Sequence, residues 1–165
     1  MSAIRNEASK NGFLLRSIRE LLEHRALWLY LLRDEARARG LEWEPFANAA
    51  IMRCGLYQGA RLVGKGGTKS LKGLKRTLFT LPARAVFEMK IRKSTDDELS
   101  IDFSYCPLVK AWQKQGASDE DIGALCDVAM RGDQGIGEAY GCRLDLPKSI
   151  AKGDSVCELR YRRLD

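Results

Sequence analysis

The sequence predicts an α+β fold in which an antiparallel sheet of about four strands, arranged as two hairpins, packs against several helices. The main observation is that stretches with apolar residues at helical spacing are interrupted by paired stretches in which apolar and polar residues alternate. The chain has 165 residues, of which 45% are hydrophobic, and this is enough for one domain with a substantial core. We therefore expect a single domain over residues 1–165.

Two long helices open the predicted fold. Apolar positions recur at helical spacing over residues 13–36, and the middle of this stretch is apolar all round, so we expect it to run through the core. A second helix begins near Pro45 and carries one continuous apolar face that includes Cys54, which we expect to be buried. A short helix is then predicted over residues 70–80, ended by Pro82.

Two hairpins supply the predicted strands. Residues 85–92 and 99–105 alternate between apolar and polar side chains on either side of a turn-forming segment, which is typical of an antiparallel hairpin. Residues 142–146 and 157–161 show the same alternation near the end of the chain.

Cys106 stands immediately before a predicted helix start. Pro107 suits the first helical position, and an apolar helical pattern follows it. Unpaired amides and the positive end of the helix dipole favour a thiolate at such a place. We therefore interpret Cys106 as the candidate reactive thiol, which iodoacetamide should label before the other four cysteines. An inert core cysteine is the ordinary alternative.

A further helix begins after Ser118, and the sequence predicts that it loosens at Gly132. Asp127 lies one residue beyond the predicted core face of this helix. Its ordinary role would be an ion pair with Arg131, one turn away. Partial burial would instead make it a candidate general acid or base.

Metal and cofactor sites are not expected. His24 is the only histidine, so any imidazole chemistry must use it, although a hydrogen-bonded histidine at a packing boundary is the common case. The five cysteines are widely spaced and include no C-x-x-C pair, which argues against disulfides and zinc. Residues 59–67 nearly match a phosphate-binding loop, but a glycine replaces the required hydroxyl and no strand precedes the segment.

The positive charge of the chain is local. The net charge is +6, and residues 64–93 contain nine Lys or Arg against the single acid Glu88. A solvated segment is the ordinary explanation, and contact with an anionic substrate or polyanion is the alternative. Nucleic acid is not favoured, because no aromatic residues interleave with the first basic cluster. The apolar runs are too short for a membrane span and the N-terminus lacks a signal-peptide core, so we expect a soluble cytoplasmic protein with no membrane contact.

Five different blocks of sequence follow one another along most of the chain in the order typical of a known family. They are HRALWLYLLRDEA (24–36), IMRCGLYQG (51–59), YCPLVKAW (105–112), LCDVAMRGD (125–133) and LPKSIAKGDSVCELRYR (146–162). Together they resemble the 2-amino-thiazoline-4-carboxylic acid hydrolase-like family. The positions that match recurrent motif residues of that family are Cys54, Cys106, Cys126, Asp127, Gly153, Asp154 and Cys157.

The resemblance implies hydrolysis of a small cyclic amidine, in which water opens a thiazoline ring. Such a reaction needs a nucleophile, a proton donor for the leaving group and a cationic contact for the substrate carboxylate. Our candidate catalytic residues are Cys106, as nucleophile or polar wall, Asp127, as acid or base, and His24. The candidate substrate contacts are Arg53, Lys152 and Tyr105.

A non-catalytic binding domain is the rival interpretation. The closing block is also similar to small-ligand-binding domains of the vinyl-reductase type, which share an α+β design around a hydrophobic pocket. Members of the hydrolase-like family often carry a histidine where this chain has Ser104, and this departure favours the rival. Either interpretation requires a small-molecule substrate or ligand, and a homo-oligomer is left open.

Overall fold

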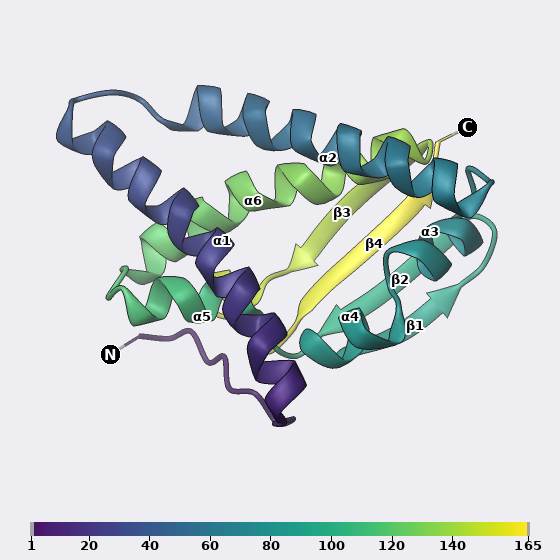
Figure 1. Ribbon diagram of the computed structural model, residues 1–165, viewed down its shortest axis with the longest axis horizontal. Helices are drawn as coiled ribbons and strands as arrows, with labels where there is room; N and C mark the ends of the chain where they lie inside the picture. Colours follow the sequence, from purple (N-terminus) through teal and green to yellow (C-terminus); the bar gives the residue numbers. More distant parts are fainter. Residues whose placement is uncertain (1, 165) are drawn as a thin grey trace.

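The structure, a computed structural model, describes residues 2–164 and has two layers. A four-stranded antiparallel sheet in the order β1-β2-β4-β3 lies against helices that cover one of its faces (Figure 1). The α+β class and both hairpins are confirmed. The elements are α1 (Phe13–Ala38), α2 (Glu44–Gly66), α3 (Leu71–Thr77), α4 (Leu81–Val86), β1 (Met89–Ser94), β2 (Glu98–Phe103), α5 (Pro107–Lys114), α6 (Asp119–Ala139), β3 (Cys142–Lys148), the 3-10 turn η1 (Ile150–Lys152) and β4 (Cys157–Arg163).

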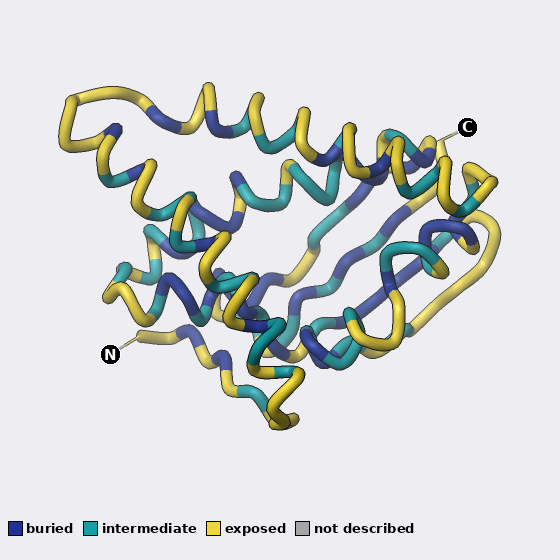
Figure 2. Tube along the Cα trace, in the orientation of Figure 1, coloured by how far each residue is buried: buried dark blue, intermediate teal, exposed yellow. Residues whose placement is uncertain are grey.

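Helix α1 forms where the apolar spacing predicts it, but it does not run through the core. One side packs against α5, where the indole N–H of Trp112 donates to the carbonyl of Ala26 at 3.0 Å. The opposite side carries exposed Leu21, Trp28 and Leu32, so the expectation that the helix is buried all round is wrong. The physical reason is that α1 has protein on one side only (Figure 2). None of the helices within residues 2–164 has both the length and the apolar character needed to cross a bilayer.

Helices α2 and α6 approach each other through glycine. A Cβ atom on Gly55 would lie 2.1 Å from the carbonyl oxygen of Gly132, and one on Gly135 would lie 2.6 Å from the carbonyl oxygen of Met52. Any side chain at Gly55 or Gly135 would therefore push the two backbones apart. The prediction that α6 loosens at Gly132 is wrong, because the helix continues unbroken to Ala139 along this contact.

The same contact explains why Cys54 is exposed rather than buried. Its neighbour Gly55 faces α6, and a residue one position away on a helix is rotated by about 100°. The apolar residues of α2 cover a wide part of its surface, and the part that is buried carries Gly55 and Gly59. The predicted burial of Cys54 is therefore wrong.

Residues 81–86 form helix α4 instead of the first part of a strand. The sequence predicts that Pro82 ends a helix, but it lies in the first turn of α4, where its missing N–H costs no hydrogen bond. Strand β1 begins only at Met89. The preceding helix, α3, is capped by Ser70, whose hydroxyl accepts the amide of Gly73 at 3.0 Å.

A buried ion pair joins α1 to the start of β1. The guanidinium of Arg19 donates to Glu88 at 3.1 Å and to the carbonyls of Val86 and Lys10 at 3.0 and 2.6 Å. Burial alone would raise the pKa of Glu88, but hydrogen bonds from Ser9, Lys10 and Arg19 lower it overall. Removing either partner would leave a buried charge without compensation, which typically costs about 3–5 kcal/mol.

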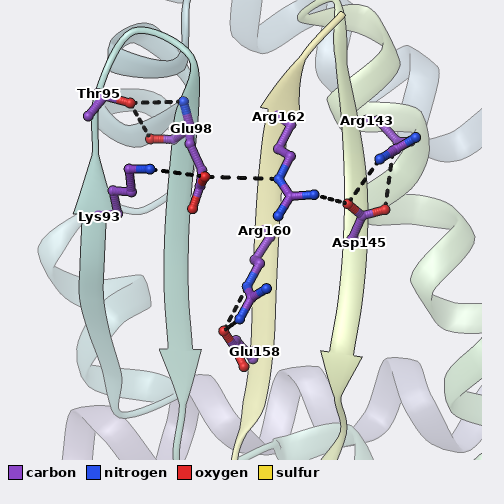
Figure 3. Close-up of polar contacts among 8 residues, drawn as sticks. All are labelled: Lys93, Thr95, Glu98, Arg143, Asp145, Glu158, Arg160 and Arg162. Atoms are coloured by element: carbon purple, nitrogen blue, oxygen red, sulfur yellow. Dashed lines mark hydrogen bonds and ion pairs between the residues drawn. The ribbon is translucent and has the colours of Figure 1, made fainter.

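The two faces of the sheet differ in character. Buried apolar side chains of β2 and β4 face the helices, and the opposite face carries charged pairs across the strands (Figure 3). Arg162 lies between Glu98 and Asp145, at 3.9 and 3.4 Å. Exposed pairs of this kind contribute little stability, so the sheet depends on its inner face.

The glycine contact predicts opposite effects for two substitutions in α2. Gly55→Ala should lower the free energy of unfolding by about 3 kcal/mol, because its Cβ would collide with the backbone of α6. Gly64→Ala should raise it by about 0.5 kcal/mol, because nothing lies within 4 Å of the added atom and alanine favours the helix. Urea unfolding of both variants measures the difference. Equal effects would contradict the assigned helix contact.

Candidate functional site

Cys106 is the N-cap of α5, as the sequence predicts. Its backbone is held by Asn6, whose side-chain oxygen accepts the Cys106 amide at 2.9 Å and whose side-chain nitrogen donates to the Cys106 carbonyl at 2.8 Å. Asn6 is almost completely buried. The N-terminal segment thus fixes the position of this cysteine.

Burial opposes the predicted thiolate at Cys106. Burial raises the pKa of the thiol, and the neighbouring thiol of Cys157 raises it further. The amides of Val109 and Leu108 at the helix start act in the expected direction and lower it, but they do not compensate for the loss of hydration. The balance of these effects favours the neutral thiol.

Two more thiols lie close to Cys106, around the turn that precedes β4. The sulfur of Cys126 is 3.6 Å from the hydroxyl of Ser149, and the sulfur of Cys157 accepts the amide of Ile150 at 3.3 Å. Burial raises the pKa of both thiols, to about 12 for Cys126. Asp154 accepts the amide of Ser149 at 2.8 Å. The family motif around Gly-Asp-x-x-Cys thus closes a turn in this structure.

Asp127 and Lys152 form an exposed ion pair. The lysine nitrogen lies 2.8 Å from one carboxylate oxygen and 3.0 Å from the other. Two of the predicted site residues are therefore brought together, but in solvent, which removes the desolvation on which an acid–base role for Asp127 depended. The alternative pair with Arg131 does not form, because Arg131 donates to Asn48 and Gln134.

The remaining predicted site residues lie apart from this turn. His24 is exposed on α1 and accepts a hydrogen bond from the indole of Trp28 at 3.2 Å. Arg53 is exposed on α2, in a shallow groove of about 550 Å³ beside Cys54. Tyr105 is buried beneath the guanidinium of Arg19, 4.4 Å from its ring centroid, and burial raises the pKa of its hydroxyl to about 12.

Asp133 of α6 is a shielded carboxyl group outside the set of predicted site residues. Burial raises the pKa of Asp133 on α6 to about 6, and Arg25 of α1 lowers it only in part. Its side chain has no hydrogen bond or ion pair within residues 2–164, yet it retains some accessible surface. The carboxyl is therefore shielded from most of the solvent but keeps a surface that a small molecule can reach.

A buried hydroxyl without a partner accompanies this carboxyl. Tyr161 of β4 is completely buried, and its hydroxyl has no hydrogen-bond partner among the described residues. Burial raises the pKa of Tyr161 well above its ordinary value, and the charge of Asp133 raises it further. Its ring lies on Gly137, one turn beyond Asp133, where an added Cβ would be 3.2 Å from the ring. A buried polar group of this kind requires an explanation.

The inward face of α6 therefore presents a thiol, then a carboxyl group, then a glycine that contacts a tyrosine ring. Cys126 lies beside Cys157 at the start of β4, and Gly137 lies beside Tyr161 near the end of that strand, so Asp133 is positioned between them. A signal for Asp133 was present in the sequence. It lies at helical spacing from the core residues Cys126 and Met130, and a carboxylate on an apolar face is uncommon.

Within residues 2–164, no group of three or more His, Cys, Asp or Glu side chains is arranged to hold a metal ion.

Comparison with known proteins identifies the family of the chain. Residues 19–161 match the family described as L-2-amino-thiazoline-4-carboxylic acid hydrolase. The chain belongs to this family. At the level of the family, the match supports a hydrolase. No curated protein sequence matches the chain at the significance required.

A solved structure has a similar fold. It is a trafficking protein particle complex subunit 3 from Naegleria fowleri, covalently bound to palmitic acid. The TM-score is 0.52 at 16% sequence identity, and the similarity covers 87% of this chain and 95% of that one. At this identity the similarity shows the fold alone.

Accessibility predicts a different order of thiol labelling from the one expected from the sequence. A limiting amount of iodoacetamide at neutral pH should label exposed Cys54 first, then half-buried Cys106, and only slowly the three buried cysteines. Peptide mapping of the native protein measures the order, with Cys54→Ala as the control that removes the fast site. Modification of Cys106 ahead of Cys54 would restore the thiolate interpretation.

Proposed function

We propose that this protein hydrolyses a small cyclic amidine of the thiazoline type in an enclosed site between α6 and the inner face of the sheet. The observation that carries the proposal is the Asp133 carboxyl, which has no protein partner among residues 2–164, beside the unpartnered hydroxyl of Tyr161. The family match supports the reaction class. A protonated amidine offers N–H donors and a positive charge, which suit an enclosed carboxylate.

Asp133 is the acid–base group in this proposal. Its carboxylate accepts a proton as water attacks the amidine carbon, and the carboxyl then returns a proton to the departing ring sulfur. The carbon–sulfur bond breaks. Counted from the neutral ring, the two protons of water end on the ring nitrogen and on the new thiol. Counted from the protonated ring, whose nitrogen already carries its proton, one proton of water ends on the thiol and the other passes through Asp133 to solvent. A pKa of about 6 suits a group that must gain and lose a proton near neutral pH.

The other candidate residues have supporting roles. Tyr161 holds a polar atom of the substrate through its hydroxyl. Cys106 contributes a neutral thiol to the wall of the site, in agreement with its raised pKa. Lys152 lies near Cys126 and could meet the substrate carboxylate only by exchanging its partner Asp127. His24 and Arg53 have no part, because both lie on exposed faces of their helices.

The test is release of free thiol from 2-aminothiazoline-4-carboxylate and from related 2-aminothiazolines, in which the ring sulfur becomes the thiol. Asp133→Asn should lower kcat/KM by about 100-fold or more, which is the ordinary contribution of a general base. For the parent, kcat/KM should rise with pH through about 6 and then level off, because the base acts in its ionised form above its pKa.

Glu138→Gln is the matched control, since it removes an exposed carboxylate from the same helix and should leave the rate unchanged. Cys106→Ser should also retain most of the activity. A parent that releases no thiol from any of these compounds would contradict the proposed reaction, and an active Asp133→Asn would contradict the proposed base.

A binding domain without catalysis is the second candidate. It is supported by the similarity to a structure that carries a bound fatty acid, and by the aromatic rings of Phe79, Phe87 and Phe103 on the inner side of the sheet. Mass spectrometry of the denatured protein distinguishes the two functions. A long apolar molecule released in stoichiometric amount would favour the binding domain.

A further inference from the structure

The basic stretch of the sequence folds around one groove, outside the enclosed site. This groove has a volume of about 680 Å³ and lies between α3, α4 and the end of β1. Its lining includes the four cations Lys72, Lys75, Arg76 and Arg84. We propose that the groove is a binding site for a ligand that carries a phosphate group. No part of the hydrolase proposal depends on it.

The contacts of these cations leave most of their charge available. Lys72 pairs with the exposed carboxylate of Asp96 at 2.8 Å, and the hydrogen bond from Lys72, together with its charge, lowers the pKa of Asp96. Lys75 donates to the hydroxyl of Ser94 at 3.3 Å, which is a neutral partner. The four cations and one acid therefore leave the groove with a charge of about +3.

The two arginines have donors for an anion. Arg76 uses one nitrogen to donate to the carbonyl of Gly66 at 2.9 Å, and this contact orients the rest of its guanidinium group. Arg84 has no side-chain hydrogen bond or ion pair within the described residues. Guanidinium groups bind phosphate oxygens in a bidentate manner, and several cations favour a multiply charged ligand over a single carboxylate.

The apolar part of the groove argues against a nucleic acid. Phe79 forms its floor but is only 4% exposed, so no base could stack on it. Leu81, by contrast, is 76% exposed at the rim. An exposed apolar side chain beside clustered cations suits a phosphate attached to an apolar group, which could be a soluble organic phosphate or the headgroup of a lipid.

The test measures binding by calorimetry with two soluble probes, inorganic pyrophosphate and a short-chain phosphatidic acid, and by sedimentation with phosphatidylcholine vesicles that contain phosphatidic acid. Lys75→Gln combined with Arg84→Gln should weaken binding by about tenfold or more, because each lost charge-assisted hydrogen bond is worth about that factor. Circular dichroism and thermal unfolding establish that the variant is folded.

The control combines Arg143→Gln with Lys148→Gln on β3, which removes the same charge from exposed positions elsewhere. It should bind like the parent. Binding of pyrophosphate as tight as that of phosphatidic acid supports a soluble phosphate as ligand, and binding of phosphatidic acid or its vesicles alone supports a lipid headgroup. Three results would contradict the proposed site. They are equal loss of binding in both double variants, binding of an RNA oligonucleotide without binding of either soluble phosphate, and no binding of any probe.

Discussion

The close contact of α2 with α6 is the constraint on which the rest of the structure depends. Gly55 and Gly135 bring the two backbones so near that no side chain fits between them. One side of α6 packs against α2, and the adjacent side faces β4. Along this adjacent side, Cys126 lies beside Cys157 at the start of β4, and Gly137 lies beside Tyr161 near its end. The place of Asp133 in the interior follows from this arrangement. A wider helix separation would shift the carboxyl relative to the Tyr161 hydroxyl, and the proposed site would lose its geometry.

An interior carboxyl without a partner among residues 2–164 is expensive for a small domain. Its pKa of about 6 means that it is largely ionised at neutral pH in surroundings that disfavour the charge. Glu88 is also buried, but it accepts hydrogen bonds from Arg19 and from two further donors. Its pKa is therefore lowered, whereas that of Asp133 is raised. The contrast is the strongest argument that Asp133 is present for function, because structural charges in this fold are paired.

The sequence predicted the elements better than it predicted the site. Apolar spacing and the cap at Ser118 gave the helices, and alternation gave both hairpins, since these patterns are local. The errors concern long-range contacts. Cys54 was placed in the core because side-chain periodicity does not reveal that glycine forms the buried edge of α2. The thiolate at Cys106 stays a prediction that burial opposes, because the helix dipole can be inferred from the sequence, whereas burial of the thiol cannot. Asp133 is the last residue of the block LCDVAMRGD. Its importance lies in having neither a hydrogen bond nor an ion pair within residues 2–164, and only the packed structure shows this.

The most direct test of the central claim is the pH dependence of stability for the parent and for Asp133→Asn. Because the pKa of Asp133 rises from 3.8 to about 6 on folding, the native state of the parent should lose stability as the pH increases from about 4 to about 6. The variant lacks this titration, so the difference between the two unfolding curves should grow over that range. At neutral pH the variant should be more stable by about 3 kcal/mol, since the rise of the pKa from 3.8 to about 6 costs the native state about 1.4 kcal/mol per pH unit. Parallel curves, or a variant less stable at neutral pH, would show that Asp133 is hydrated or paired in solution and would contradict the account.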